Sequence, residues 1–219
     1  MEHTADLKTE KLDRRIVRTR QSLRTALMDL VKAKSFDEIS VEEITGRADV
    51  SRATFYLHYK DKEDLLLDQF YEMAMERVQD FSEFPSSFWL AALGAAGTEN
   101  PPDLPLLKIF ELAEKNAGLY RILLRGGSSR RLVDGIREIT TQAFQNFLVN
   151  KFSNELQRTQ LPLPMDLLVA YFTGALLSTM VWWLEQEPRM SAEQITRLFN
   201  QLFFPGVRTA LQLDRLPNP

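Results

Sequence analysis

The sequence contains no cysteine and only two histidines, His3 and His58, among its 219 residues. Without cysteine there is no disulfide, no thiolate metal ligand and no cysteine nucleophile, which fits a reducing compartment. Two histidines disfavour a histidine metal centre, and no Gly-x-Ser-x-Gly motif is present. We therefore predict no catalytic residue, no metal site and no cofactor, and we expect that the protein is not an enzyme.

Strand signals are also scarce. No alternating run of Val, Ile and Thr occurs, and no Asn-Gly or Asp-Gly turn joins two such runs. The hydrophobic content of 44% is nevertheless enough for a substantial core. We therefore predict an all-α fold of about nine or ten helices.

The first 15 residues are polar and charged and lack the apolar core of a secretory signal, so we expect a cytoplasmic protein. One uncharged run, residues 167–184, reaches the lower limit of length for crossing a bilayer. It contains Thr173, Gly174 and Ser178, and Glu185 follows it instead of a basic anchor. We expect a helix buried on nearly all sides; a membrane span is the less favoured alternative.

Charge is distributed unevenly along the chain, although the net charge is only −3. Residues 1–60 carry 12 Lys and Arg against 10 Asp and Glu, whereas residues 61–219 carry 15 against 20. The bias is strongest in residues 8–24, which hold seven basic residues and two acidic ones. The amino-terminal part is therefore locally basic, and the remainder is acidic.

Several short helices are predicted in the amino-terminal part. An apolar stripe that starts at Ile16 predicts a first helix, which ends near residue 35. Ser40 and Glu43 match a capping box at the start of a second, short helix. Asp49 suits a left-handed turn at the end of that helix. Ser51 is positioned to cap a third helix of at most two turns, residues 52–58.

Longer helices are predicted after this region. Asp61 caps an amphipathic helix that extends to about Phe81. A last helix begins after Ser191, with Gln194 in the matching capping position, and Pro205 is expected to kink it. The ranges expected for the carboxyl-terminal helices are 86–96, 104–116, 119–124, 129–156, from about 165, and 192–213.

Two short helices joined by a tight turn, with a helix packed behind them, are typical of a helix-turn-helix unit. In the third helix we expect Ala53, Phe55 and Leu57 to face the core. The outward residues, which are able to contact phosphates or base edges in the major groove, are then Arg52, Thr54, Tyr56 and His58. Lys62 supplies a cation at the start of the next helix, where a phosphate would fit.

The run "RTRQSLRTALMDLVKAKSFDEISVEEITGRADVSRATFYLHYKDKEDLL" resembles the DNA-binding domain of the TetR family of bacterial transcriptional regulators. The resemblance covers nearly 50 residues. Its most specific part is the Ser-Arg-x-Thr-aromatic-Tyr-x-His-aromatic pattern in "VSRATFYLHY", followed by "KDKEDLL". It implies DNA contacts at Ser40, Val41, Arg52, Thr54, Tyr56, His58, Tyr59 and Lys62.

Two departures and several alternatives accompany this resemblance. The family usually has alanine at position 45 and glycine at position 49, where this chain has Thr45 and Asp49. Tyr56 and Tyr59 could instead be core aromatics, since short amphipathic helices often bury them. We interpret the basic residues 8–15 as a solvated tail, and a phosphate or minor-groove contact is the less favoured alternative.

The resemblance implies four regions: a flexible basic arm at 1–15, a helix-turn-helix DNA-binding domain at 16–62, a connecting helix at 63–83, and an effector-binding and dimerisation domain at 84–219. It implies a homodimer that binds a palindromic double-stranded operator and responds to a small-molecule effector, as a repressor more often than an activator. The last two helices, about 165–186 and 191–213, would form the dimer interface, without any membrane. The alternative is a helical small-molecule-binding or scaffold protein without DNA binding.

Overall fold

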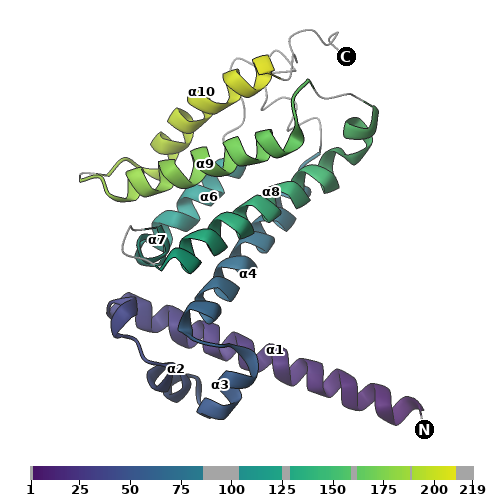
Figure 1. The fold of residues 1–219 in the computed structure, drawn as a ribbon, viewed down its shortest axis with the longest axis vertical. Helices are drawn as coiled ribbons and strands as arrows, with labels where there is room; N and C mark the ends of the chain where they lie inside the picture. Colours follow the sequence, from purple (N-terminus) through teal and green to yellow (C-terminus); the bar gives the residue numbers. More distant parts are fainter. Residues whose placement is uncertain (1, 86–103, 125–128, 159–161, 188, 211–219) are drawn as a thin grey trace. The chain divides into compact units, whose positions relative to one another are not determined.

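The computed structural model describes residues 2–85, 104–124, 129–158, 162–187 and 189–210. Nine α-helices and one 3-10 helix, with no strand, make up these described residues (Figure 1). The prediction of an all-α fold is confirmed. The chain divides into two compact units, Met1–Phe70 and Tyr71–Pro219. The division falls inside helix α4, Lys62–Ser82, within the segment predicted as a connecting helix.

The first unit contains α1 (Glu2–Ala33), the 3-10 helix η1 (Phe36–Glu38), α2 (Val41–Ala48), α3 (Arg52–His58) and the first part of α4. Helix α1 starts at Glu2 instead of near Ile16, so residues 2–15 of the segment expected to be a flexible arm are helical. Its Glu, Lys, Leu and Arg residues all favour helix, which allows α1 to continue beyond the apolar stripe.

The predicted caps of the short helices are present. The Ser40 hydroxyl accepts the Glu43 amide at 3.2 Å, and the Glu43 carboxylate accepts the Ser40 amide at 2.9 Å, which completes the capping box of α2. Asp49 has φ 54° and ψ 47°, the left-handed turn expected for this position. The Ser51 hydroxyl accepts the Thr54 amide at 3.0 Å and caps α3.

The core of the first unit lies between α1, α2, α3 and the start of α4. Phe55 is its single fully buried aromatic ring, and it is accompanied by fully buried aliphatic side chains from the other elements: Leu23, Leu27, Ile44, Leu65 and Leu66. Thr45, which stands where the family usually has alanine, is buried as well. Its hydroxyl donates to the Glu42 carbonyl at 3.0 Å, so the burial leaves no unsatisfied donor.

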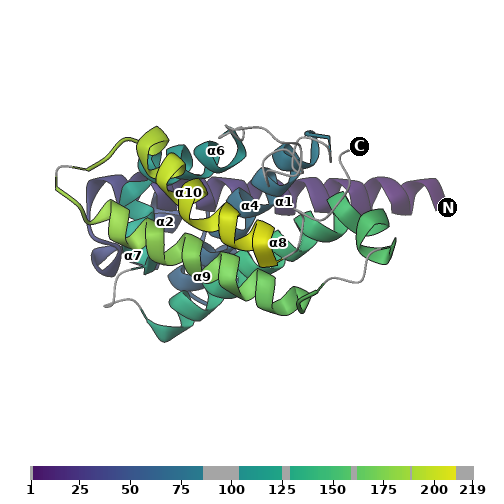
Figure 2. The ribbon, with the colours of Figure 1, turned by 90° about the horizontal axis from the view of Figure 1, so that it is seen from above.

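The second unit contains the rest of α4 and five further helices of the described chain: α6 (Leu104–Lys115), α7 (Ala117–Leu124), α8 (Arg130–Arg158), α9 (Met165–Leu184) and α10 (Ala192–Ala210). These agree with the predicted ranges to within a few residues, and the helix expected at 86–96 lies outside the described residues. The Ser191 and Gln194 cap of α10 is present. Helix α9 contacts both α8 and α10 (Figures 1 and 2).

Aromatic rings build the core of the second unit. Phe110 of α6 makes edge contacts with Trp183 of α9 and Phe199 of α10, at centroid distances of 5.6 and 5.9 Å. Phe172 stacks on Phe144 of α8 at 3.9 Å and meets Phe203 at 5.4 Å. These contacts join α6, α8, α9 and α10 into one packed layer.

Helix α9 is buried on one side instead of on nearly all sides, which corrects the expectation from its composition. In the described part of the chain it is the one helix long and apolar enough to cross a membrane, and 44% of that apolar stretch is buried. Leu167, Tyr171 and Trp182 are exposed on its other side. The described residues therefore cover only about half of this apolar helix.

Candidate nucleic-acid interface

Helix α3 presents most of its surface to solvent while one residue anchors it. Phe55 is fully buried, whereas Arg52, Ala53, Tyr56 and Leu57 are exposed. The prediction that Ala53 and Leu57 face the core is wrong, since Leu57 is 82% exposed. Residues two positions from Phe55 lie about 200° around the helix from it, on the opposite side. The exposed face is therefore broader and more apolar than the sequence suggested.

Thr54 and His58 complete this face at intermediate exposure. The Thr54 hydroxyl lies 2.8 Å from the Ser51 hydroxyl, so the capping residue also fixes the Thr54 side chain. Together with Arg52 and Tyr56, these side chains offer cationic, hydroxyl and imidazole groups on two helical turns. Such groups are suited to phosphates and base edges.

Ser40 and Val41 lie at the exposed or partly exposed start of α2, as expected. The Ser40 hydroxyl is already engaged, because it accepts the Glu43 amide and donates to the Glu43 carboxylate at 3.0 Å. The Lys34 ammonium, bonded to the Glu43 carboxylate at 2.5 Å, and the Ser40 amide lower the pKa of Glu43 from 4.5 to about 2. The start of α2 is thus a pre-ordered surface with a persistent carboxylate.

Tyr59 belongs to the interior of the first unit. Its ring is only 3% exposed, and its hydroxyl donates to the Asp68 carboxylate at 2.6 Å. Burial, and then the Asp68 carboxylate, raise the pKa of Tyr59 well above its ordinary value. Of the two tyrosines considered for the interface, Tyr56 is exposed, and Tyr59 is a core residue that ends α3.

The Lys62 ammonium is occupied by backbone carbonyls. It donates to Phe36, Asp37 and Ile39 at 2.8, 3.0 and 2.9 Å and lies 4.8 Å from the centre of the Phe36 ring. An ammonium group has three donors, so these bonds use all of them. Lys62 therefore ties the start of α4 to the η1 segment that leads into α2.

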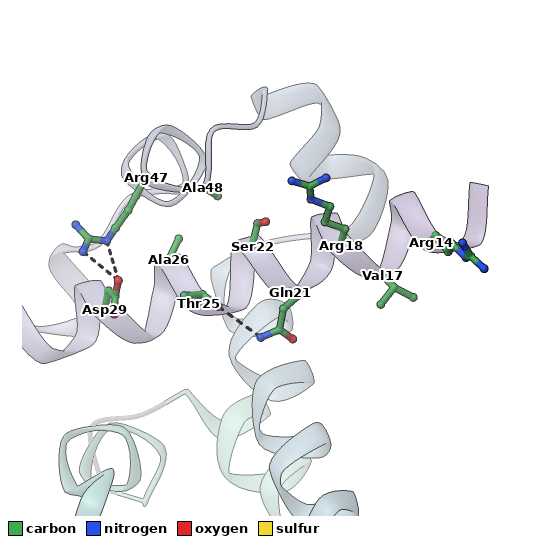
Figure 3. Close-up of a pocket in the computed structure, with 10 residues that line it drawn as sticks. All are labelled: Arg14, Val17, Arg18, Gln21, Ser22, Thr25, Ala26, Asp29, Arg47 and Ala48. Carbon is green, nitrogen blue, oxygen red and sulfur yellow. Dashed lines mark hydrogen bonds and ion pairs between the residues drawn. The ribbon is translucent and has the colours of Figure 1, made fainter. Parts of the chain in front are cut away.

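A cleft of about 1000 Å³ lies along α1 and α2 in the same unit. Arg14 and Arg18, one turn apart on α1, are among its lining residues, and the Arg47 guanidinium bonds to Asp29 at 3.0 Å across it. Figure 3 shows Arg18, Ser22 and Ala26 pointing from α1 to the side where α2 lies. For Arg14, within residues 8–15, a phosphate contact was the less favoured alternative, and Arg18 was noted only as part of the basic cluster in residues 8–24.

Comparisons with known proteins agree with this geometry. Residues 23–68 match the family described as bacterial regulatory proteins, tetR family, and residues 102–204 match the family described as transcriptional regulator C-terminal region. The two matches together span more than half of the sequence. The chain belongs to the TetR family of bacterial transcriptional regulators.

Individual relatives resemble this TetR-family regulator in part or in fold. The HTH-type transcriptional regulator YxbF of Bacillus subtilis (strain 168) is 43% identical over 60 residues, which is 27% of this chain and only 16% of YxbF. A TetR-family regulator of Syntrophomonas wolfei has a TM-score of 0.63 at 16% identity, over 88% of this chain and 96% of its own. FadR of Bacillus subtilis, solved with stearoyl-CoA, has a TM-score of 0.59 at 20% identity, over 85% and 98%.

These matches establish the fold of the TetR-family regulator and its general role. It is a DNA-binding transcriptional regulator with an amino-terminal helix-turn-helix, formed by α2 and α3, and a carboxyl-terminal helical region.

Proposed function

We propose that this regulator acts in the cytoplasm as a homodimeric repressor, which binds a palindromic operator through α3 and is released by a small-molecule effector. The observation that carries the proposal is the exposed face of α3, held from behind by the fully buried Phe55. Arg52, Thr54, Tyr56 and His58 are the proposed contacts to bases and phosphates. The exposed Leu57 adds an apolar group that suits a thymine methyl.

The remaining predicted contacts have different parts in this proposal. Ser40 and Val41 approach the DNA backbone at the start of α2. Tyr59 and Lys62 support the interface from behind, since the Tyr59 hydroxyl bonds to Asp68 and the Lys62 ammonium bonds to three carbonyls. Arg14 and Arg18 of the cleft supply additional phosphate contacts.

The exposed sides of α9 and α10 support dimerisation. Large apolar side chains and small residues share one side of α9: Leu167, Ala170, Tyr171, Gly174, Ser178 and Trp182. A Cβ added at Gly174 would meet nothing within 4 Å in the chain, so another helix could approach closely there. Leu198 and Leu202 of α10 are exposed as well. Two copies of α9 and α10 would cover these faces as a four-helix interface.

A dimer explains why a palindrome is expected. Two copies of α3 related by a twofold axis contact two half-sites of the same sequence in opposite directions. An effector releases the dimer only if it binds the form with lower operator affinity more tightly. FadR was solved with stearoyl-CoA, which supports a small-molecule effector in general terms without assigning its chemistry here.

The experiment is a selection of bound duplexes from a random DNA library by the full chain, followed by gel-shift titration. The expected result is an inverted repeat. Tyr56→Ala should lower affinity for the selected duplex by about tenfold or more, because a base contact contributes roughly 1–3 kcal/mol. Tyr71→Ala, at a partly exposed tyrosine of α4, is the matched control and should keep wild-type affinity.

Two outcomes of this selection would contradict the proposal. If the folded wild-type chain enriches no duplex, the DNA-binding proposal fails. The chain would then fit the alternative of a helical small-molecule-binding or scaffold protein. An enriched site without twofold symmetry would instead overturn the palindromic arrangement.

A further inference from the structure

Side chains from three helices of the first unit meet at one carboxylate, Asp68 of α4. Arg20 and Arg24 of α1 both pair with it, Arg24 at 3.1 Å. The Tyr59 hydroxyl, at the residue that ends α3, donates to the same carboxylate at 2.6 Å. We call Arg20, Arg24, Tyr59 and Asp68 the Asp68 cluster. It joins α1, α3 and α4 at a single point.

Three members of the Asp68 cluster, Arg24, Tyr59 and Asp68, are largely removed from solvent, whereas the Arg20 side chain is 40% exposed. The Asp68 side chain is 12% exposed, and that of Arg24 is 9% exposed. The Arg20 Nε donates to the Tyr59 hydroxyl at 3.2 Å, and its guanidinium lies 5.7 Å from the centre of the Tyr59 ring. Arg24 also donates to Gln21 at 3.1 Å. Tyr59 is therefore held both through its ring and through its hydroxyl.

A buried cluster of charged side chains is not an efficient way to stabilise a fold. Removing charges from water costs free energy, and apolar side chains of similar volume often stabilise a protein as well or better. Charge-assisted hydrogen bonds do, however, fix distance and direction more strictly than apolar contacts. The cluster is therefore better explained by the geometry that it imposes than by stability.

We propose that Asp68 and Tyr59 are positioning residues, which hold α3 in the orientation that the operator requires. This inference rests on the proposed function of α3. Tyr59 follows His58 directly, and its amide donates to the Phe55 carbonyl at 2.9 Å, so its side chain and the last turn of α3 are joined. Asp68 lies two residues before the end of the first unit, on a helix that continues to Ser82. A displacement of this part of α4 is therefore transmitted to the recognition helix.

The test compares Tyr59→Phe with Tyr71→Phe in the full chain. Tyr59→Phe removes only the hydroxyl and keeps the buried ring. Its affinity for the duplex selected by the wild type should fall about tenfold or more, the size of a lost bond to a charged partner. Affinity for an unrelated duplex should be unchanged, since phosphate contacts remain. Tyr71→Phe, on the partly exposed tyrosine of α4, should behave as wild type in both assays.

A double-mutant cycle with Asp68→Asn tests whether Tyr59 and Asp68 act on operator affinity through one shared bond. If both residues act through one bond, Tyr59→Phe/Asp68→Asn should lose no more operator affinity than Asp68→Asn alone. Additive losses would overturn the proposal. Should Asp68→Asn fail to fold, Tyr59→Phe alone decides, and unchanged specific affinity in that variant refutes the positioning role.

Hydrogen exchange in the absence of DNA gives a readout that does not depend on the operator. Tyr59→Phe should accelerate exchange of the amides in the last turn of α3 by about fivefold, with little change in α1 and α2. Uniform acceleration over the whole unit, or none, contradicts the proposal. Failure of the wild type to select any duplex removes the proposed function, whereas normal selection with unaltered Tyr59→Phe behaviour removes only the positioning role.

Discussion

Phe55 and Leu57 are both large apolar residues of α3, yet Phe55 is fully buried and Leu57 is almost entirely exposed. Phe55 packs behind the helix, with its ring 5.8 Å from that of Tyr59. Leu57 projects on the opposite side of α3. Its side chain is exposed there, so it gains no stabilisation from burial. On the proposed recognition helix, we expect Leu57 to make its contact only in the complex with DNA.

Leu57→Ala and Phe55→Ala are expected to separate stability from DNA affinity. Leu57→Ala should change the free energy of unfolding by no more than about 0.5 kcal/mol, because its side chain is exposed. It should weaken operator binding by about tenfold through loss of an apolar base contact. Phe55→Ala should cost about 3–5 kcal/mol of unfolding free energy. Urea unfolding and gel-shift titration of both variants test this, and similar destabilisation by the two substitutions would contradict it.

Hydrogen bonds between residues close in sequence were predictable, and hydrogen bonds between distant residues were not. The Ser40–Glu43 and Ser51–Thr54 bonds join residues three apart, so local spacing was sufficient to predict them. The Lys62 bonds reach back 23 to 26 residues, and the Arg20–Tyr59 bond spans 39. The position of Lys62 at a helix start and the family resemblance suggested a phosphate contact, and nothing in the local pattern revealed the carbonyls that it binds.

At the scale of helices, α2 and α3 are short, and the residues at their ends determine where each helix begins and ends. Capping boxes and the left-handed Asp49 were predictable because they depend on side-chain chemistry within a few positions. The inward face of α3 was not predictable, since seven residues give too little periodicity to distinguish one side from another. The orientation of such a helix is decided by what it packs against.

Acid should weaken the start of α2 through Glu43. The pKa of Glu43 is lowered from 4.5 to about 2, so its stabilising effect is fully present above pH 4.5 and is lost as the pH falls toward about 2. Glu43→Gln removes the charge but preserves the capping geometry. The difference in unfolding free energy between wild type and Glu43→Gln should therefore shrink as the pH is lowered from about 5 to about 3.

Denaturant titrations at several pH values measure this difference. Glu42→Gln, at the neighbouring residue outside the capping box, is the matched control for loss of one carboxylate. A constant difference between wild type and Glu43→Gln across this pH range would rule out the proposed role of the Glu43 charge.

At the scale of the whole molecule, the apolar residues of α9 and α10 are divided between a buried side and an exposed side. The aromatic core of the second unit buries one side of α9 and α10, and leaves Trp182 and Leu202 at their outer sides. Composition predicted a helix buried on nearly all sides, because composition does not distinguish cover by the same chain from cover by a second copy. The proposed dimer interface would thus account for the apolar residues in 167–184 that the described chain leaves exposed.

Leu202→Glu should convert the protein to a monomer at micromolar concentration. Leu202 is 80% exposed, so the substitution should leave the fold intact while placing a charge in the proposed interface. Sedimentation velocity measures the oligomeric state, and circular dichroism checks helix content. Val149→Glu, at an exposed apolar residue of α8, is the matched control and should remain dimeric. A dimeric Leu202→Glu variant would exclude α10 from the interface.

The neighbouring tryptophans of α9 have a practical consequence. Trp183 is fully buried and donates from its indole to the Met190 carbonyl at 2.8 Å, whereas the Trp182 indole meets water on the proposed dimer face. Indole fluorescence shifts to shorter wavelength when water is excluded. With the third tryptophan, Trp89, replaced by phenylalanine, these adjacent positions provide an internal reference and a reporter, and association of two copies is expected to shift the emission spectrum without any added label.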